Sequence, residues 1–278
     1  MRTKYTTLIS VEELSALRSS EDIVLLDCRF YLMDTAKGRK EYMQSHIPGA
    51  IYLDINHDLS SPVIRGVTGR HPLPKPQILE ATLISSGLNN KSQVVVYDQS
   101  NGAYASRAWW LLRWLGHKDV AVLNGGFKAW TSKDLPVDNM WTLPLQGNFK
   151  ADLQENMTVY MESLGSLHNP LVDSREYTRY SGEHETIDPI AGHIPGAVCV
   201  PYLDNTFESG EWKNKEELKK KFSAIELASK DSPVFYCGSG ITACHNILAY
   251  KIATGKDSKL YPGSWSEWIN HNKVKSEK

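Results

Sequence analysis

One short stretch of the sequence contains the residue types that a nucleophilic thiol needs. It runs V-F-Y-C-G-S-G-I-T-A-C-H, from Val234 to His245, and places Cys237 directly after an apolar run. Gly238 and Gly240 favour a tight loop, and the residues from Ala243 onward are compatible with a helix. Backbone N–H groups of such a loop and of a helix N-terminus converge on one concavity and favour negative charge there. A cysteine in that position is predicted to react as a thiolate.

The alternative role for Cys237 is that of a buried structural thiol at a strand end. The flanking glycines favour the reactive role, because a merely buried thiol does not need a loop that wraps it. Cys244 lies two turns into the expected helix, where we expect a small core residue rather than a redox partner. Cys237, Cys244 and His245 are not expected to hold zinc, since two adjacent ligands cannot converge with a third. No metal and no cofactor are therefore predicted.

Apolar runs elsewhere in the chain predict the elements that must position this loop. Continuous runs of strand length are typical of a sheet that is covered on both faces. Helix-compatible segments alternate with these runs, and the first follows a capping-box pattern from Ser10 to Glu13. The expected strands include Ile23–Arg29, Val94–Asp98 and Val120–Leu123, and the expected helices include Pro76–Leu88 and Ser106–Leu115.

Four motifs of the first half of the chain return in the same order in the second half. They are L-L-D-C-R at Leu25 and L-V-D-S-R at Leu171, H-I-P-G-A at His46 and again at His193, V-V-Y-D ending at Asp98 and V-F-Y-C ending at Cys237, and N-G-G-F-K-A-W at Asn124 and P-G-S-W-S-E-W at Pro262. One match of this length can be accidental, but four collinear matches indicate an internal repeat.

The repeat predicts an α/β protein with two tandem copies of one domain. Strands that alternate with helices imply a mainly parallel sheet flanked by helices in each copy. We expect an N-terminal domain at residues 1–138, a polar linker at 139–156 and a C-terminal domain at 157–278. A chain of 278 residues is long enough for two domains that each bury a core.

The two copies differ at the end of the equivalent strand. The first copy ends this strand with Asp98, and only the second has Cys237 and the compact glycine loop. A carboxylate surrounded by backbone N–H groups is a stable ground state and a poor sulfur nucleophile. We therefore assign the chemistry to the C-terminal domain and a non-catalytic role to the N-terminal domain.

Composition restricts the class of partner. The 31 basic and 32 acidic residues give a net charge of −1, which argues against nucleic acid or an anionic membrane as the main partner. Four cysteines do not make a disulfide framework and suit a reducing compartment. The chain has neither a signal-peptide pattern nor a run of membrane-spanning length, so a cytoplasmic protein is expected.

These motifs resemble the two-domain rhodanese family, which includes thiosulfate sulfurtransferases and 3-mercaptopyruvate sulfurtransferases. The resemblance extends from about Ser10 to Trp268 and is carried by the paired H-I-P-G-A motifs, the D-x-R strand ends and C-G-S-G-I-T-A. It implies that Cys237 takes a sulfane sulfur from a small anionic donor and forms a persulfide. The sulfur then passes to an acceptor thiol, for example on a thioredoxin-like protein, or to cyanide.

The resemblance also implies roles for residues around the cysteine. Arg179 matches the arginine that binds the anionic group of the donor, for which a bidentate guanidinium is suited. His71 matches a histidine beside the cysteine, and Ser239 is expected to donate to the persulfide or the donor carbonyl, or to be a plain turn serine. Gly238, Gly240, Ile241 and Thr242 complete the predicted substrate-binding loop. Thr242 can point its hydroxyl at the sulfur or cap the following helix, and we expect capping with a minor contact to the sulfur.

Two features leave the preferred donor open between 3-mercaptopyruvate and thiosulfate. Thiosulfate enzymes commonly have two basic side chains after the cysteine, whereas this loop reads G-S-G, as in mercaptopyruvate enzymes. Mercaptopyruvate enzymes also have a second arginine shortly before the second H-I-P-G, but residues 184–191 contain none. Their aspartate beside the histidine is replaced by Asn56, and Asp58 is the alternative partner of His71.

Two other functions are compatible with parts of this sequence pattern. A phosphatase of the same fold needs an arginine six residues after the cysteine, where this chain has Ala243. The loop of this chain is also one residue too short to bind a phosphate. A non-catalytic sulfur-carrier or binding module needs neither the intact loop nor Arg179. We therefore favour the sulfurtransferase.

Overall fold

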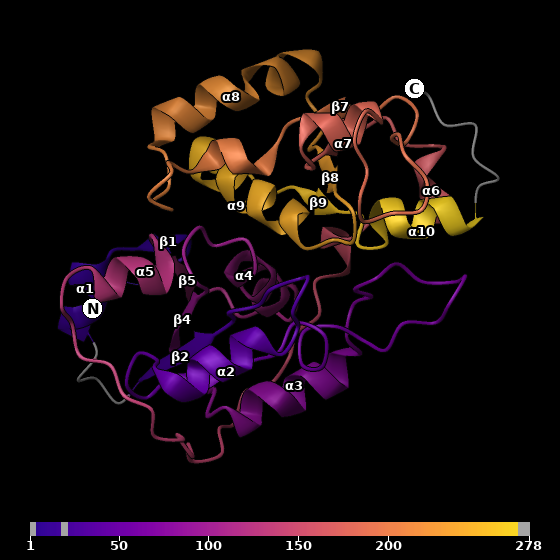
Figure 1. The fold of residues 1–278 in the computed structure, drawn as a ribbon. Helices are drawn as coiled ribbons and strands as arrows, with labels where there is room; N and C mark the ends of the chain where they lie inside the picture. Colours follow the sequence, from indigo (N-terminus) through magenta and orange to yellow (C-terminus); the bar gives the residue numbers. More distant parts are fainter. Residues whose placement is uncertain (1–3, 18–21, 272–278) are drawn as a thin grey trace. The chain divides into compact units, whose positions relative to one another are not determined.

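The first half of the chain forms a five-stranded parallel sheet with the order β1-β5-β4-β2-β3 (Figure 1). The computed structural model describes residues 4–17 and 22–271. The strands are β1 (Leu8–Ile9), β2 (Ile23–Asp27), β3 (Ile51–Tyr52), β4 (Gln93–Tyr97) and β5 (Val120–Leu123). The helices are α1 (Val11–Leu17), α2 (Lys37–Gln44), α3 (Pro76–Ser85), α4 (Ala105–Trp114) and α5 (Gly126–Thr131).

Helices cover both faces of this sheet. Side chains alternate along a strand, so neighbouring residues of β2 face opposite layers. Leu25 packs in one core cluster with residues of α1 and α5, including Leu14 and Trp130. Leu26 lies against α3 and α4, in contact with a small apolar space that Leu83 and Leu111 also line. The uninterrupted apolar strands of the sequence follow from this burial on two sides.

The second half repeats the design with four parallel strands in the order β7-β6-β8-β9. The strands are β6 (Leu171–Asp173), β7 (Val198–Cys199), β8 (Val234–Tyr236) and β9 (Lys259–Leu260). The helices are α6 (Met161–Leu164), α7 (Tyr177–Ser181), α8 (Lys215–Ala228), α9 (Thr242–Thr254) and α10 (Ser264–His271), with 3₁₀ helices η1 (Glu155–Met157) and η2 (Tyr202–Asn205). This arrangement confirms the predicted α/β fold class.

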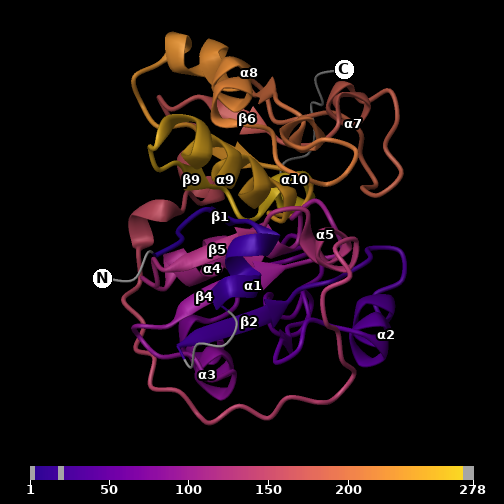
Figure 2. The same cartoon turned by 90° about the vertical axis from the view of Figure 1, so that its left-hand side faces the viewer.

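Both faces of the second sheet are also covered. Tyr236 shares a core cluster with Trp265 of α10 and Leu164 of α6. Phe235 points the other way, with its ring 6.1 Å from that of Phe222 in α8 and 5.9 Å from that of Tyr250 in α9. Helices α8 and α9 lie side by side in both views of the chain (Figures 1 and 2).

The chain separates into two compact units, each of which includes a segment from the other half of the sequence. The first unit consists of residues 1–61, 74–154 and 206–212, and the second of residues 62–73, 155–205 and 213–278. The boundaries proposed from the repeat, at residues 138 and 157, stay a prediction. What matters for the site is that Pro62–Leu73 belongs to the second unit.

A buried ion pair lies at the end of β2 and at the end of β6, the equivalent strands of the two repeats. Arg29 donates from Nε and Nη2 to Asp27, and its Nη2 also donates to the Ser45 carbonyl at 2.7 Å. Arg175 binds Asp173 in the same way and donates to the Gly192 carbonyl at 2.7 Å. Each pair therefore ties a strand end to the residue just before the histidine of H-I-P-G-A.

The two repeated histidines occupy equivalent places. His46 Nδ1 lies 2.7 Å from the Tyr42 carbonyl oxygen and His193 Nδ1 lies 2.9 Å from that of Tyr180. Each imidazole stacks on the tyrosine whose carbonyl it contacts, with ring centroids 4.0 and 3.9 Å apart. Because this arrangement also exists in the half where Asp98 takes the place of Cys237, it is part of the scaffold.

Among the described residues, no helix is long and apolar enough to cross a membrane. The same residues contain no group of three or more His, Cys, Asp or Glu side chains that could hold a metal ion.

Replacing Arg175 by Met should destabilise the second unit, because it leaves the fully buried Asp173 carboxylate without its partner. Breaking one side of a buried pair costs about 3–5 kcal/mol. Urea-induced loss of hydrogen-exchange protection in β6 and β8 measures the effect. The double variant Asp173→Asn/Arg175→Met should lose less free energy of unfolding than Arg175→Met alone. An equal or larger loss of this free energy would mean that the unpaired Asp173 carboxylate is not the cause of the destabilisation.

Candidate active site

Cys237 lies at the end of β8, at the point where the loop before α9 begins. Its side chain is almost fully buried, and the residue is 2% exposed. The Ser239 and Gly240 amides donate to Cys237 Sγ at 3.4 and 3.1 Å. The loop therefore presents backbone N–H groups to the sulfur, which is the arrangement that stabilises negative charge on it.

The segment after β9 fixes the shape of this loop. The Cys237 amide donates to Ser264 Oγ at 3.1 Å, and the Trp265 amide donates to the Cys237 carbonyl at 2.9 Å. Gly240 has φ +79° and lies against Pro262, whose carbonyl oxygen would be 2.5 Å from an added Cβ. Only glycine satisfies both the positive φ and this close approach.

The start of α9 differs from the sequence-based expectation. Ile241 occupies the N-cap position, and no side chain of the described chain caps this end of the helix. Thr242 is the first helical residue, so the prediction that it caps the helix is wrong. The physical reason is that the backbone turns into the helix directly from Gly240, one residue earlier than a threonine cap would require.

The segment Pro62–Leu73 brings His71 to the cysteine loop. His71 Nδ1 and Ser239 Oγ are 2.7 Å apart, and both residues are buried. The segment is attached to the end of α10, because Asn270 donates to the Thr68 carbonyl at 3.1 Å. Sequence reasoning paired His71 with the cysteine loop only by resemblance, and the structure shows the contact through Ser239.

Arg70 is the residue of this neighbourhood that sequence reasoning missed. Its backbone amide donates to Ser266 Oγ at 3.1 Å, and its guanidinium pairs with Asp188. A Cβ added to Gly238 would lie 2.7 Å from Arg70 Nη2 and 3.5 Å from Arg179 Nη2. Two guanidinium groups therefore lie over the first glycine of the loop. The signal for it in the sequence is the pair of basic residues in G-R-H, Arg70 and His71.

Arg179, in α7, has two carboxylate partners. Its Nε lies 3.1 Å from both oxygens of Glu185, and its Nη2 donates to Asp188 Oδ2 at 2.9 Å. Burial acts to raise the pKa of Glu185, but hydrogen bonds from Arg179 and from backbone amides outweigh it and lower the pKa. Burial raises the pKa of Asp188, an effect that Arg70 partly offsets. The region before the second H-I-P-G thus contributes carboxylates rather than a second arginine.

The first unit shows what replaces the thiol in the other repeat. The Asp98 carboxylate is fully buried and accepts hydrogen bonds from the amides of Ser100, Gly102, Tyr104 and Ala105, at 2.9 to 3.3 Å. Burial raises the pKa of Asp98, and these backbone donors act against the rise. The same kind of N–H ring that faces Cys237 Sγ is here occupied by a carboxylate.

The other cysteines occupy environments that disfavour a thiolate or keep the sulfur packed. All four cysteines are free. Burial raises the pKa of Cys199 to about 12 and that of Cys28 well above its usual value. Cys244 is fully buried in α9, with Sγ 3.3 Å from the Gly240 carbonyl oxygen, as a core residue. The thiol for which the structure shows two backbone N–H donors is that of Cys237, which receives them from Ser239 and Gly240.

The two residues considered as partners for His71 have local roles in the first unit. The Asp58 carboxylate accepts from the Asp54 amide at 2.7 Å, and the Asn56 amide donates to Asp54 Oδ1 at 2.7 Å. These bonds close the turn that follows β3. Burial raises the pKa of Asp58.

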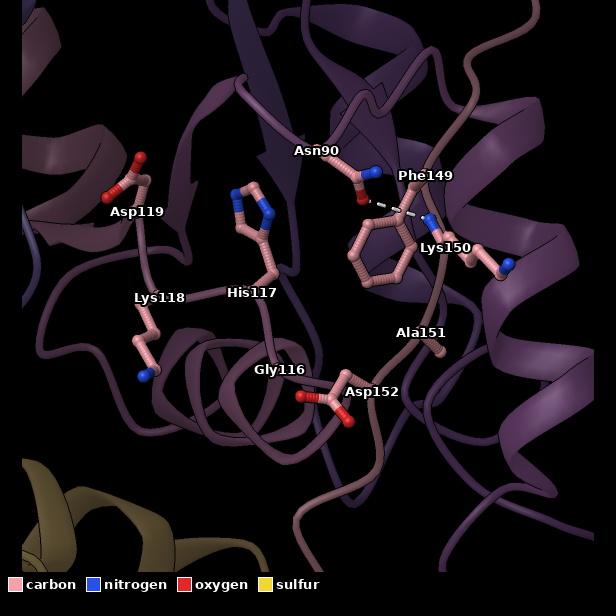
Figure 3. Close-up of a pocket in the computed structure, with 9 residues that line it drawn as sticks. All are labelled: Asn90, Gly116, His117, Lys118, Asp119, Phe149, Lys150, Ala151 and Asp152. Carbon is pink, nitrogen blue, oxygen red and sulfur yellow. Dashed lines mark hydrogen bonds between the residues drawn. The ribbon is translucent and has the colours of Figure 1, made fainter.

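The first unit also has an open pocket of about 610 Å³, which Figure 3 shows. It is lined by Asn90, Gly116, His117, Lys118, Asp119, Phe149, Lys150, Ala151 and Asp152. Asn90 Oδ1 accepts from the Lys150 amide at 3.0 Å, and the His117 ring meets the edge of Phe149 (Figure 3). The pocket contains none of the predicted site residues.

Comparison with known proteins places the chain in a family. The model of the rhodanese-like domain matches residues 10–133 and 157–271. A probable 3-mercaptopyruvate sulfurtransferase of Pseudomonas aeruginosa is 45% identical over 268 residues, with 94% of each chain covered. The thiosulfate sulfurtransferase of Bos taurus is 34% identical, with 96% of this chain and 93% of that protein covered.

Solved structures agree with this assignment. The structure of SseA from Escherichia coli, described as a 3-mercaptopyruvate sulfotransferase, has a TM-score of 0.82 at 29% identity and covers 95% of this chain and all of its own. The 3-mercaptopyruvate sulfurtransferase from Leishmania major has a TM-score of 0.85 at 28% identity, over 95% of this chain and 74% of that chain.

A duplicated parallel α/β fold with a cysteine in an N–H-lined loop defines a sulfurtransferase of the rhodanese type, and this chain belongs to the rhodanese-like domain family. The protein is a sulfurtransferase enzyme, since relatives named 3-mercaptopyruvate and thiosulfate sulfurtransferases match it over nearly its full length. The predicted family and class of enzyme are thereby confirmed.

Replacing Gly240 by Ala should disable the loop, because the new Cβ would meet the Pro262 carbonyl oxygen at an unfavourable positive φ. We expect kcat/KM to fall about 10- to 100-fold or more, since loss of about 1.4 kcal/mol of transition-state stabilisation is tenfold. Gly238→Ala is the matched variant. Its Cβ meets the movable end of Arg70, so the protein should fold normally and lose donor affinity. Equal activity of Gly240→Ala and wild type would contradict the role of the loop shape.

Proposed function

We propose that this protein transfers a sulfane sulfur from 3-mercaptopyruvate, through a persulfide on Cys237, to a thiol acceptor or to cyanide. The observation that carries the proposal is the pair of amide hydrogen bonds from Ser239 and Gly240 to Cys237 Sγ. Backbone donors fixed in this way stabilise the attacking thiolate and, after the transfer, the negative charge of the persulfide.

In the first half-reaction the Cys237 thiolate attacks the sulfur of 3-mercaptopyruvate. A sulfur–sulfur bond forms, and the carbon–sulfur bond of the donor breaks. The electron pair of that bond goes to carbon and gives the enolate of pyruvate, which takes up a proton and leaves as pyruvate. Ser239, whose hydroxyl lies 2.7 Å from His71 Nδ1, is proposed to donate toward the oxygen on which charge develops.

In the second half-reaction an acceptor thiolate attacks the outer sulfur of the persulfide. The sulfur–sulfur bond breaks, and its electron pair returns to Cys237 as the thiolate. A thiol on a thioredoxin-like protein or on a small molecule then holds the persulfide sulfur, whereas cyanide would leave as thiocyanate. The enzyme alternates between thiolate and persulfide, and no metal or cofactor is needed for electron balance.

The charges around the loop support the choice of 3-mercaptopyruvate as donor. The cluster over Gly238 contains two arginines, Arg70 and Arg179, and two carboxylates, Asp188 and Glu185. Its formal charges balance, and the loop itself has no cationic side chain, which suits a monoanion better than a dianion. The relative that is 45% identical is named a probable 3-mercaptopyruvate sulfurtransferase. Thiosulfate is the second candidate donor because the Bos taurus relative is a thiosulfate sulfurtransferase.

Incubation with 3-mercaptopyruvate, followed by mass spectrometry under non-reducing conditions, should show one added sulfur atom on the peptide that contains Cys237. Cys237→Ser should show none and should lose turnover, because its hydroxyl cannot hold a sulfane sulfur. Cys244→Ala is the matched control, since it removes a neighbouring buried thiol, and it should load normally. Sulfur uptake by Cys237→Ala at another cysteine, with activity retained, would contradict the mechanism.

The ratio of kcat/KM for 3-mercaptopyruvate to that for thiosulfate, measured with one saturating thiol acceptor, tests the choice of donor. We expect a ratio of at least about 10, which corresponds to roughly one charge-assisted hydrogen bond. A ratio below one would assign the enzyme to thiosulfate. Persulfide loading without turnover on either donor would instead favour a sulfur carrier.

A further inference from the structure

A segment after α5 exposes four large apolar side chains to solvent. The segment has no helix or strand from residue 139 to residue 154 and runs along the surface of the first unit, past the end of α3 (Figure 2). Met140 is 72%, Trp141 52%, Leu143 84% and Leu145 93% exposed, and we call these four residues the apolar strip. Apolar side chains that gather on a protein surface in this way mark an interaction site.

The segment turns its apolar side chains outward. Thr142 and Pro144 are half-buried, whereas Trp141, Leu143 and Leu145 between and beside them are exposed. Side chains of an extended chain point alternately to opposite sides, so residues two apart share a side. The first unit therefore holds this segment by Thr142 and Pro144 and leaves the apolar side to solvent.

Both ends of the segment are attached to the first unit. His46 and Asp138 exchange backbone hydrogen bonds at 2.8 and 3.0 Å, and the Gly147 amide donates to a carbonyl in the last turn of α3 at 2.9 Å. The Trp141 ring meets the ring of Tyr42 in α2 edge-on, with the centroids 6.1 Å apart. Because these contacts already fix the segment, little further ordering is needed when a partner binds.

We propose that the apolar strip binds the same strip of a second copy of this chain. The sequence contains no charged residue and no histidine from Asn139 to Phe149, so two copies can meet without like charges opposite each other. A partner that is recognised by its charge would find no oppositely charged side chain within this run. A two-fold axis through the centre of the strip places Leu143 of one copy against Leu143 of the other.

The exposed area of the strip fits a weak dimer. A large side chain has about 150–250 Å² of surface, so the four exposed fractions correspond to roughly 600 Å² in each copy. Two copies would bury about 1,200 Å² in total, which is the lower limit for a specific interface. We therefore expect a dissociation constant in the micromolar range, roughly 1–100 μM.

The strip lies at the edge of the first sheet that is opposite to the Asp98 loop. It passes the ends of α2 and α3, which lead into β3 and β4, so it lies near the amino ends of the parallel strands. The Asp98 loop follows β4 and therefore lies at the carboxyl ends, where parallel α/β sheets bind their ligands. The strip is thus a surface of its own, and its role is association rather than catalysis.

Sedimentation velocity over protein concentrations from about 1 to 300 μM tests the dimer. The weight-average mass of the wild type should rise with concentration toward that of two chains. Leu143→Lys should raise the dissociation constant at least about 100-fold, because it places two ammonium groups against each other. Met33→Lys is the matched control. Met33 is 92% exposed and follows β2 at the carboxyl ends of the strands, so this substitution should leave the association unchanged.

An equimolar mixture of Leu143→Lys and Leu143→Glu tests the two-fold contact directly. Each variant alone should be monomeric, and the mixture should form a heterodimer, because opposite charges then meet on the axis. Both variants should melt at the temperature of the dilute wild type, since the substituted side chain is exposed.

Three results would overturn the proposal. The first is a wild-type protein that stays monomeric at every concentration. The second is a dimer that Leu143→Lys leaves intact, which would assign the contact to another surface. The third is binding of the monomeric wild type to phosphatidylcholine vesicles that Leu143→Lys abolishes, which would identify a lipid surface as the partner of the strip.

Discussion

Ionised groups that are buried in this protein are stable only where their pairing is complete, and the active-site region depends on that constraint. Asp173 and Arg175 form a bidentate pair with almost no exposure, and Arg175 also lies 3.3 Å from Glu185. Glu185 in turn orients Arg179, which holds Asp188. Burial of any one of these charged groups would be energetically unfavourable without the oppositely charged partner beside it in the network. The network thus extends from a strand end to the arginines over the cysteine loop.

The duplication separates what the fold needs from what the chemistry needs. Both halves keep the aspartate–arginine pair and the histidine stacked on a tyrosine, so these features serve the scaffold. Both halves also form a loop whose amides converge on the residue after the central strand. In the first half the amides bind the Asp98 carboxylate, and in the second they face Cys237 Sγ. The two loops thus differ in the residue that their amides face, a carboxylate in the first half and a thiol in the second.

The fold could be predicted from the sequence because its signals are local. Apolar runs and repeated motifs predict the longer strands, a mainly parallel sheet in each copy and the glycine loop after Cys237. Contacts of the segment Pro62–Leu73 could not be predicted in this way, because its sequence has no periodicity and Arg70 pairs with a residue 118 positions away. The prediction that Thr242 caps α9 is wrong for a local reason. A helix start one residue earlier changes the capping residue, and local propensity does not resolve a shift of that size.

Because Pro62–Leu73 belongs to the second unit, neither half of the sequence by itself contains all residues of one unit. A fragment that begins after residue 154 would retain Cys237 and its loop but would lack both Arg70 and His71. A shorter, single-domain descendant of this lineage would therefore have to replace both side chains from elsewhere. The first half of the sequence supplies the covalent link through which Pro62–Leu73 joins the second unit. In this sense the duplication cannot be reversed by simple deletion.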